Sequence, residues 1–412
     1  MVRILHTADW HIGQTLRGFS REFEHRKVFD RIARIIALRE IDVIIVSGDI
    51  FDAQNPSGDA LRLFYETLAH FRSVRPALSF VILAGNHDSA VRLEAPKPFL
   101  ASFNIHVVGN IRRAGGVVDA ERHLIPVADA KGHVAAHVLA VSYPTAACLP
   151  NLPRLEDETG SLVVRAVATL YADLVEQLRP RFQGLPLIGT GHLHVAGGTE
   201  SEGAERRILV GGQHAVPPDI FPEDFCYMAL GHLHKAQTVG RETIRYSGSL
   251  FPLSATEQPY RHGVSVVTIG DDGRSVQVEH VPIDRPVPFL RLPGDGDLHL
   301  ADLGDHFAAL DLAADLPLEE RPFLQIRLAR EGLSPGFREE IDRVAEGFPV
   351  RVVEVKLQAL PQAPTMGDGG TIPVRLAERA PEEMFRLAFE REFQTPPEAA
   401  HMEVFHRVQA EI

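Results

Sequence analysis

The sequence predicts a layered α/β protein, and three observations lead to this prediction. Short strands rich in Val, Ile and Leu alternate with helical segments in the first part of the chain. Several of these strands end abruptly and are followed by Asp, Asn or His, at the sheet edge where α/β proteins bind ligands. Hydrophobic residues make up 45% and charged residues 24% of the 412 residues, which is ordinary for a globular protein of two or three domains.

The alternation begins with a predicted strand over residues 2–7 and a helix over 22–39, whose apolar residues recur at helical spacing. The run from Val43 to Val46 predicts a strand buried on both faces, and Gly48 permits a tight exit from it. The same signals predict the later elements: helices over 57–71 and 162–177, and strands over 79–84, 185–188, 227–230, 244–249 and 264–269.

The predicted domains are a first domain of residues 1–282, a small α+β module over 286–358, a linker over 359–373 and a helical pair within 374–412. The module is read from strands over 289–292, 323–328 and 350–357 and helices over 301–313 and 336–346. The linker is rich in Pro and Gly, and the two helices are expected over 381–393 and 397–412. Their pattern alone allows packing on each other, packing on the first domain, or docking on a partner.

The location expected from the sequence is the cytoplasm. No apolar run approaches the roughly 18 residues of a membrane span, so no membrane association is expected, and residues 1–6 lack a signal-peptide pattern. Cys148 and Cys226 are far apart and match no metal or redox spacing, which fits a reducing compartment.

The formal net charge of −13 is unevenly distributed along the chain. Residues 1–270 hold 27 Lys and Arg against 28 Asp and Glu, whereas residues 271–412 hold 15 against 27. The total charge argues against binding nucleic acid through bulk attraction alone. The part that carries the candidate chemistry is nearly neutral, however, so a polyanionic substrate is compatible with it.

Five predicted strand ends deliver polar residues that suit a metal site. In chain order they are Asp9 and His11, Asp49, Asn86 and His87, His192, and His232 with His234. Oxygen and imidazole donors without a thiolate suit Mn²⁺, Fe²⁺ or Zn²⁺ in catalytic sites better than a structural zinc. Two such ions about 4 Å apart need a carboxylate between them to offset their repulsion, and Asp49 is the expected bridge.

These segments, in this order, resemble the calcineurin-like metallophosphoesterases. The segments are Asp9-x-His11, Gly48-Asp49-x-x-Asp52, Gly85-Asn86-His87-Asp88, Gly191-His192 and Gly231-His232-x-His234. Residues 7–11, 229–237 and 246–249 resemble more closely the double-strand-break repair nucleases, and this similarity spans the whole chain. The resemblance implies a metallophosphoesterase β-sandwich flanked by helices, with a small α+β capping domain that binds DNA and a C-terminal helical pair.

The resemblance also implies a role for each site residue. One metal would be held by Asp9, His11, Asp49 and His234, and the other by Asp49, Asn86, His192 and His232. His87 matches the catalytic histidine of the family, and Asp88 either orients it or caps a turn. Asp52 is included among the catalytic residues, although some relatives carry His there. His194 repeats the His-x-His spacing but is expected outside the metal ligands.

The activity implied by the resemblance is that of a DNA nuclease with two Mn²⁺ ions, with Mg²⁺ or another divalent ion as a substitute. It would act as a 3′–5′ exonuclease on double-stranded DNA and as an endonuclease on single strands or hairpins. The chain lacks a P-loop sequence, so it does not bind ATP through such a loop. The resemblance implies that ATP hydrolysis belongs to an SMC-type ATPase partner, on whose coiled coil residues 374–412 would dock. A homodimer within a heterotetramer is expected. The alternative is a stand-alone metallophosphatase or cyclic-nucleotide phosphodiesterase.

Overall fold

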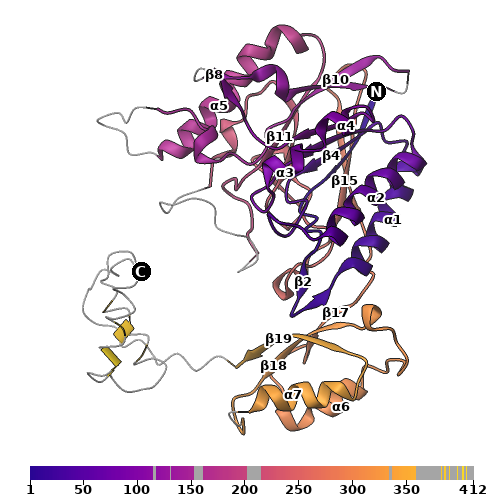
Figure 1. Cartoon of the computed structure of the whole chain (residues 1–412), viewed down its shortest axis with the longest axis vertical. Coiled ribbons are helices and arrows are strands. Elements are labelled where there is room, and N and C mark those ends of the chain that lie inside the picture. The colour runs from indigo at the N-terminus through magenta and orange to yellow at the C-terminus, as the bar shows by residue number, and fades with distance from the viewer. Residues whose placement is uncertain are drawn as a thin grey trace. The chain divides into compact units, whose positions relative to one another are not determined.

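The computed structural model forms two compact units, Met1–Gln358 and Ala359–Ile412 (Figure 1). It describes residues 1–114, 117–129, 131–152, 161–201, 215–333 and 336–358, and single positions between 382 and 405. The predicted linker over 359–373 lies outside the described residues, as does most of the predicted helical pair. At the described positions of the second unit, the rings of Phe385 and Phe405 stack with centroids 4.6 Å apart.

Two six-stranded sheets form the centre of the first unit. In spatial order, the first sheet contains β16 (Val276–Pro282), β15 (Gly263–Ile269), β1 (Val2–Thr7), β4 (Val43–Ser47), β5 (Ser79–Leu83) and β6 (Ile105–Val108). The second contains β13 (Gln237–Val239), β14 (Arg241–Tyr246), β12 (Phe225–Gly231), β11 (Leu187–His192), β10 (Val134–Leu139) and β9 (Leu124–Ala128). In both sheets the central strands that lead to the site are parallel, so their carboxyl ends share one edge.

Alternating side chains bury both faces of each sheet, which produces four layers. From β4, Val43 and Ile45 pack against the second sheet, together with Val138 and Ile188 from that sheet. Ile44 points the other way, into the core beneath α1 (Glu22–Leu38) and α2 (Gly58–Val74). On the far face of the second sheet lies α5 (Leu162–Phe182), as Figure 1 shows. The predicted layered α/β arrangement is therefore confirmed for the first unit.

A third sheet lies within the first unit and contains β17 (Phe289–Leu292), β18 (Phe323–Leu328) and β19 (Arg351–Leu357). Its strands are all parallel and are connected through α6 (Leu303–Ala308) and α7 (Phe337–Glu346). The sequence predicted an α+β module here, and the parallel pairing makes it a βαβαβ arrangement instead. The helix predicted over 301–313 is shorter, because its first turn is 3₁₀ and it ends at Ala308.

A buried arginine and aromatic stack joins the three-stranded sheet to the rest of the first unit. The Arg351 guanidinium lies 3.7 Å from the centroid of the Phe323 ring, and the Arg21 guanidinium lies 5.2 Å from the same ring. Arg21 also lies 4.4 Å from the Phe251 ring and donates two hydrogen bonds of 2.7 Å to the carboxylate of Glu24. Both guanidinium groups are buried, and each donates to a main-chain carbonyl oxygen, of Arg321 for Arg351 and of Pro252 for Arg21. Phe323 is thus held between a cation from each side of the junction.

The remaining short elements lie around the sheets. They are β2 (Thr15–Leu16), β3 (Phe19–Ser20), α3 (Ala90–Glu94), α4 (Lys97–Ala101), β7 (Arg113–Ala114) and β8 (Val117–Val118). Strands β11 and β12 are longer than predicted. Strand β11 continues through Gly191 and ends at His192, and β12 ends at Gly231, directly before His232. Within the described ranges, the structure contains no helix of the length and apolarity needed to cross a membrane.

Candidate metal centre

The carboxyl ends of β4, β11 and β12 meet at one edge, and main-chain atoms join them. The carbonyl oxygen of Ser47 lies 2.8 Å from Nδ1 of His192, and the Ser47 hydroxyl donates to the carbonyl oxygen of Ala229. The exit of β1 is attached to the exit of β4, because Asp9 N donates to Gly48 O at 3.1 Å. Strand ends that are remote in sequence therefore form one rigid platform.

The ligand candidates at these exits adopt left-handed backbone conformations. Asp9, His11 and Asp49 have φ values of 52°, 47° and 50°, and His232 has a φ of 104°. Such conformations cost energy for residues with a side chain and persist where the surroundings fix them, most often at functional sites. Here they turn successive side chains toward the same space at the sheet edge.

Glycines at the strand exits allow the segments to approach closely. A Cβ atom on Gly85 would lie 2.1 Å from Oδ1 of Asp49, and one on Gly48 would lie 2.2 Å from Nδ1 of His192. A Cβ atom on Gly231 would lie 2.0 Å from the Ser47 carbonyl oxygen. The glycine of each motif therefore makes room for the neighbouring ligand or strand.

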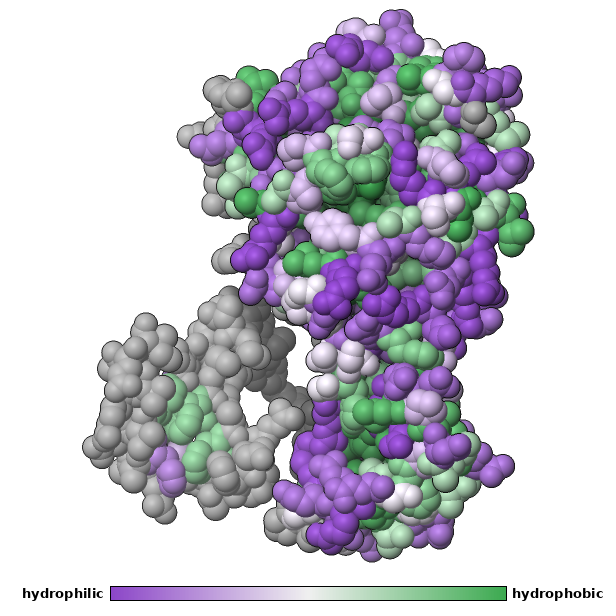
Figure 2. Space-filling view, turned by 45° about the vertical axis from the view of Figure 1, so that its right-hand side comes forward, coloured by the Kyte–Doolittle hydropathy of each residue, from purple (hydrophilic) through white to green (hydrophobic). Residues whose placement is uncertain are grey.

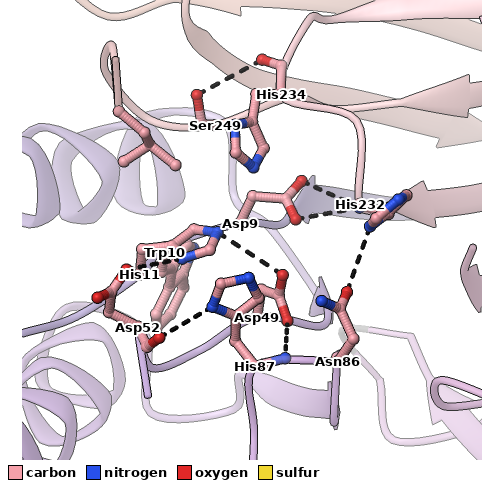
Figure 3. Close-up of polar contacts among 12 residues, drawn as sticks. Asp9, Trp10, His11, Asp49, Asp52, Asn86, His87, His232, His234 and Ser249 are labelled. Atoms are coloured by element: carbon pink, nitrogen blue, oxygen red, sulfur yellow. Dashed lines mark hydrogen bonds and ion pairs between the residues drawn. The ribbon is translucent and has the colours of Figure 1, made fainter. Parts of the chain in front are cut away.

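Six of the seven predicted metal ligands converge on one region in Figure 3, and His192 joins them through its contacts with Asp49 and Asn86. Three overlapping groups have ligand atoms within 4.8 Å of one another: Asp9, His11 and His234; Asp9, Asp49 and His192; and His11, Asp52 and His87. Asn86 and His232 adjoin them, because Oδ1 of Asn86 lies 2.9 Å from Nε2 of His192 and 3.2 Å from Nδ1 of His232. Divalent metal ions suit this set of carboxylate, amide and imidazole donors.

One buried atom supports the fit to a metal in particular. Nε2 of His11 has no hydrogen-bond partner among the described residues and lies 3.6 Å from Oδ2 of Asp49. Leaving a buried ring nitrogen unpaired is costly unless the site holds a ligand for it. A metal ion between His11 and Asp49 would satisfy this atom.

Burial and mutual charge shift the ionisation of the cluster. Burial raises the pKa of Asp9. Burial alone would also raise the pKa of Asp49, but His192, His11 and His87 lower it far below its usual range. Burial opposes protonation of His192 as well, yet the Asp49 carboxylate raises the pKa of His192 to about 9. The buried carboxylates thus create a strong demand for positive charge, which divalent cations would meet.

His87 is positioned from two sides by neighbouring segments. Its main-chain N donates to Oδ1 of Asp49 at 2.8 Å, and its Nδ1 lies 2.9 Å from the carbonyl oxygen of Asp52. The Asp52 carboxylate lies 3.3 Å from Nδ1 of His11. Asp52 therefore contacts both histidines, one through its main chain and one through its side chain.

Asp88 lies against the backbone of the β4 exit. Its two carboxylate oxygens accept hydrogen bonds from the main-chain N atoms of Ile50, Phe51 and Gly85 at 2.8–3.1 Å. Burial and the nearby charge of Asp49 raise the pKa of Asp88 to about 6. These contacts favour the turn-capping alternative over an orienting role for Asp88 toward the His87 ring.

Glu257 is a site residue that the sequence interpretation missed. Its carboxylate is fully buried and lies 2.8 Å from Nδ1 of His234, while its other oxygen accepts from Leu253 N at 2.9 Å. A carboxylate behind a histidine fixes the ring so that Nε2 faces the metal. Its only sequence signal is a lone acid following the largely apolar stretch 250–255.

His194, which the sequence interpretation placed outside the metal ligands, contacts Glu200. Its Nδ1 is 3.2 Å from Oε1 of Glu200, and its side chain is partly exposed. It belongs to none of the groups of His, Asp and Glu that bring their ligand atoms together among the described residues.

Comparisons with known proteins place this chain among related sequences. The calcineurin-like phosphoesterase family model matches residues 2–196, and the type 5 capsule protein repressor C-terminal domain model matches residues 285–393. Three similar proteins are each named as the D subunit of the nuclease SbcCD. That of Rhodobacter capsulatus is 43% identical over 392 residues, covering 94% of each chain.

The second, from Bacillus subtilis, is 34% identical and covers 86% of this chain and 90% of its own. The third, from Escherichia coli, is 30% identical and covers 86% of this chain and 85% of its own. This level of identity over nearly the full length shows the family directly. The chain therefore belongs to the family of SbcCD nuclease D subunits, within the calcineurin-like phosphoesterases.

Proposed function

We propose that this chain hydrolyses DNA phosphodiester bonds with two divalent metal ions, preferably Mn²⁺. It would act as a 3′–5′ exonuclease on duplex ends and as an endonuclease on single strands and hairpins. The observation that carries the proposal is the convergence of Asp9, His11, Asp49, His192 and His234, with the unpaired Nε2 of His11 facing Asp49. The name shared by the similar proteins supports the nuclease activity.

In the proposed site, Asp49 would contribute to both metal positions. Asp9, His11 and His234 would complete the first, and Asn86, His192 and His232 would complete the second. Bound divalent ions would supply an activated water and polarise the scissile phosphate. The close approach of Gly85 to Asp49 supports this assignment, because it fixes the carboxylate centrally among the imidazoles.

His87 would contact the scissile phosphate in this proposal. Because its Nδ1 faces the carbonyl oxygen of Asp52, the ring presents Nε2 to the substrate. From there the imidazole can donate to a phosphoryl oxygen or to the departing oxygen. Asp52 would act as a positioning residue, holding His11 through its carboxylate and His87 through its carbonyl group.

The proposal is tested by comparing two substrates with the purified protein and Mn²⁺. Cleavage of linear duplex DNA far above hydrolysis of a small phosphomonoester is expected. The reverse preference would indicate a stand-alone phosphatase instead. Absence of both activities, together with no bound or activating divalent ion, would refute both enzyme assignments.

We also propose that residues 374–412 dock on the coiled coil of an SbcC-type SMC ATPase, and that residues 286–358 form a capping domain that binds DNA. The name of the relatives, a D subunit of SbcCD, supports an ATPase partner. The two free cysteines support a location in the cytoplasm.

Deleting residues 375–412 should spare metal-dependent cleavage and abolish association with the ATPase. A truncated protein that still co-purifies with the partner would refute the docking assignment.

A homodimer within the assembled complex completes the proposal. An apolar groove between α2 and α4 supports it, and its wall includes Leu68, Phe99 and Phe103, with Phe99 67% exposed. In Figure 2 the face bearing α2 is turned forward, and hydrophobic side chains form a patch on a mainly hydrophilic surface. A second copy of this chain would cover such a patch.

Light scattering should show a dimer in the wild type. The substitution Phe99→Glu should dissociate this dimer, whereas the control Leu38→Glu, at another exposed apolar position, should leave it intact. A monomeric wild type would refute the proposal.

A further inference from the structure

A concave basic pocket adjoins the metal centre and is not used by the chemistry described above. We use the term basic pocket for the cavity of about 440 Å³ whose wall includes Lys235, Arg245, Tyr260, Arg261 and His280. It lies where the end of the second sheet meets β15 and β16 of the first. The cations come from three separate segments, so the fold, and no single loop, brings them together.

No carboxylate among the described residues forms an ion pair with the cations of the basic pocket. Within the described part of the chain, the side chains of Lys235, Arg245 and Arg261 form no ion pair. Nearby, Arg285 donates to the main-chain oxygens of Gln258 and Tyr260, so these two hydrogen bonds bring no negative charge to its guanidinium group. Elsewhere on the same unit many arginines pair with acids, as Arg3 does with Glu40 and Arg26 with Glu22. Gathered cations without acids mark a surface that favours an anion.

His280, in the wall of the basic pocket, lies within the positive electrostatic potential of its arginines. Its Nε2 lies 2.9 Å from the carbonyl oxygen of Arg261, while its buried Nδ1 has no hydrogen-bond partner among the described residues. Burial lowers the pKa of His280, and the positive charges of Arg245 and Arg261 lower it further. Two guanidinium groups therefore act on one point in the wall of the basic pocket.

The basic pocket is connected to the metal ligands through two short paths in the chain. Lys235 directly follows His234, and its ammonium group lies 5.8 Å from the centroid of the Tyr260 ring. Tyr260 N donates to the carbonyl oxygen of Glu257, whose carboxylate contacts His234. The wall of the pocket thus continues the shell that positions His234. A chain of phosphates crossing the pocket would lead toward the cluster.

We propose that the basic pocket binds the phosphodiester backbone of the nucleic-acid strand that the metal centre cleaves. This inference rests on the proposed nuclease function and adds to it a place where the substrate is held. A repeating polyanion is the ligand that matches several separated cations beside a phosphodiester-cleaving site. The partly exposed ring of Tyr260 adds a surface on which a base of a single strand can stack.

The test measures DNA binding separately from cleavage, using the full-length protein in EDTA. The probes are a fluorescein-labelled single strand and a blunt duplex of the same sequence, titrated at several salt concentrations. The variant is the double substitution Arg245→Gln and Arg261→Gln. The matched control, Arg34→Gln with Arg274→Gln, removes the same charge from exposed positions outside the basic pocket.

If the basic pocket contacts two or more phosphates, the pocket variant should lose affinity about tenfold or more, whereas the control should bind as the wild type does. The slope of log affinity against log salt should also fall by about 0.7 per lost contact for the single strand and about 0.9 for the duplex. If the pocket variant loses more affinity for the single strand than for the duplex, the single strand is the ligand of the basic pocket. If it loses more affinity for the duplex, the duplex is the ligand.

Equal affinities and salt slopes for the pocket variant and the control would overturn the inference, as would failure of the wild type to bind either probe. These results are distinct from failure of the proposed function. A wild type that binds DNA through the basic pocket yet cleaves none with Mn²⁺ would contradict the nuclease activity and leave the pocket assignment intact.

Discussion

The buried carboxylate of Glu257 lies 2.8 Å from Nδ1 of His234, a histidine whose other ring nitrogen faces the metal-ligand cluster. Neither residue contacts solvent appreciably, and the charge of His234 lowers the pKa of Glu257 against the effect of burial. The pair fixes both the orientation and the tautomer of the imidazole. His234 can therefore present Nε2 to a metal ion without first reorganising its ring.

Replacing Glu257 by Gln should weaken binding of Mn²⁺, because the amide holds the His234 ring without the negative charge that strengthens it as a ligand. Loss of such a partner costs about 10- to 100-fold in metal affinity. Calorimetric titration with Mn²⁺ measures this effect. The control is Glu279→Gln, an exposed carboxylate that pairs with Arg39. Equal affinities for the two variants would contradict the positioning role.

Replacing Asp49 by Ala should abolish activity through loss of both metal ions, because Oδ2 of Asp49 lies 3.6 Å from Nε2 of His11 and 3.3 Å from Nε2 of His192, one imidazole from each proposed position. The same titration should detect no high-affinity Mn²⁺ site in this variant. Residual binding of two ions with near wild-type affinity would show that Asp49 does not bridge them.

Replacing His87 by Ala should retain metal binding and lose cleavage, because its ring is held by the Asp52 carbonyl group and is not needed as a ligand. General acid catalysis contributes typically about 10²- to 10⁴-fold, so a loss of that size is expected in DNA cleavage rates. If His87→Ala loses metal as fully as Asp49→Ala does, the division of roles between the two residues is wrong.

Replacing Gly85 by Ala should inactivate the enzyme although the change adds one methyl group. The new Cβ would overlap Oδ1 of Asp49 at 2.1 Å and displace the proposed bridging ligand. Gly58→Ala provides the matched control, because a Cβ at that position meets nothing within 4 Å. Metal titration and cleavage assays on both variants decide the outcome, and an active Gly85→Ala enzyme would show that the β4 and β5 exits can separate.

The buried His6 should make folding stability depend on pH. Its Nδ1 lies 2.9 Å from the Tyr227 hydroxyl and its Nε2 lies 3.1 Å from the carbonyl oxygen of Leu230, which satisfies the neutral ring. Burial lowers the pKa of His6 from 6.5 to about 3. Above pH 6.5 the ring is neutral in both states. As the pH falls toward 3, only the unfolded chain gains the proton, so stability is lost.

Urea unfolding at a series of pH values tests the His6 prediction. In His6→Gln, the slope of unfolding free energy against pH should decrease by up to about 1.4 kcal/mol per pH unit, the contribution of one proton. His70→Gln, at an exposed position, serves as the control. A slope in His6→Gln identical to that of the wild type would show that His6 is not the group responsible.

The sequence was sufficient to predict the strand exits and the residues they carry. Strong signals were available there: continuous apolar strands such as 43–46, followed by glycine and then a ligand type. The contacts of Asp52 and Glu257 could not be predicted in this way. The contact of Asp52 with His87 uses the main-chain oxygen of Asp52, and the contact of Glu257 requires the chain after residue 250 to lie behind His234. Neither contact leaves a periodic pattern in the sequence.

The third sheet shows a second limit of prediction from sequence. Its elements were recognisable, but the parallel pairing of β17, β18 and β19 required knowledge of how the helices cross over. The contact that joins this sheet to the rest of the first unit could not be predicted either, because Phe323 has the pattern of an ordinary apolar residue of a strand. Its position between two guanidinium groups is a property of tertiary structure alone.

The arginine and aromatic stack has a consequence for how the first unit unfolds. Moving the three-stranded sheet away would expose Phe323 and Arg351 and would uncover the buried Arg21 beside Glu24. Arg21 reaches the ligand loops in turn, because its carbonyl oxygen contacts His25, whose Nε2 lies 2.7 Å from the Trp10 carbonyl oxygen. We therefore expect residues 1–358 to unfold as one cooperative unit, so that melting of the small sheet also disrupts the predicted metal ligands Asp9 and His11.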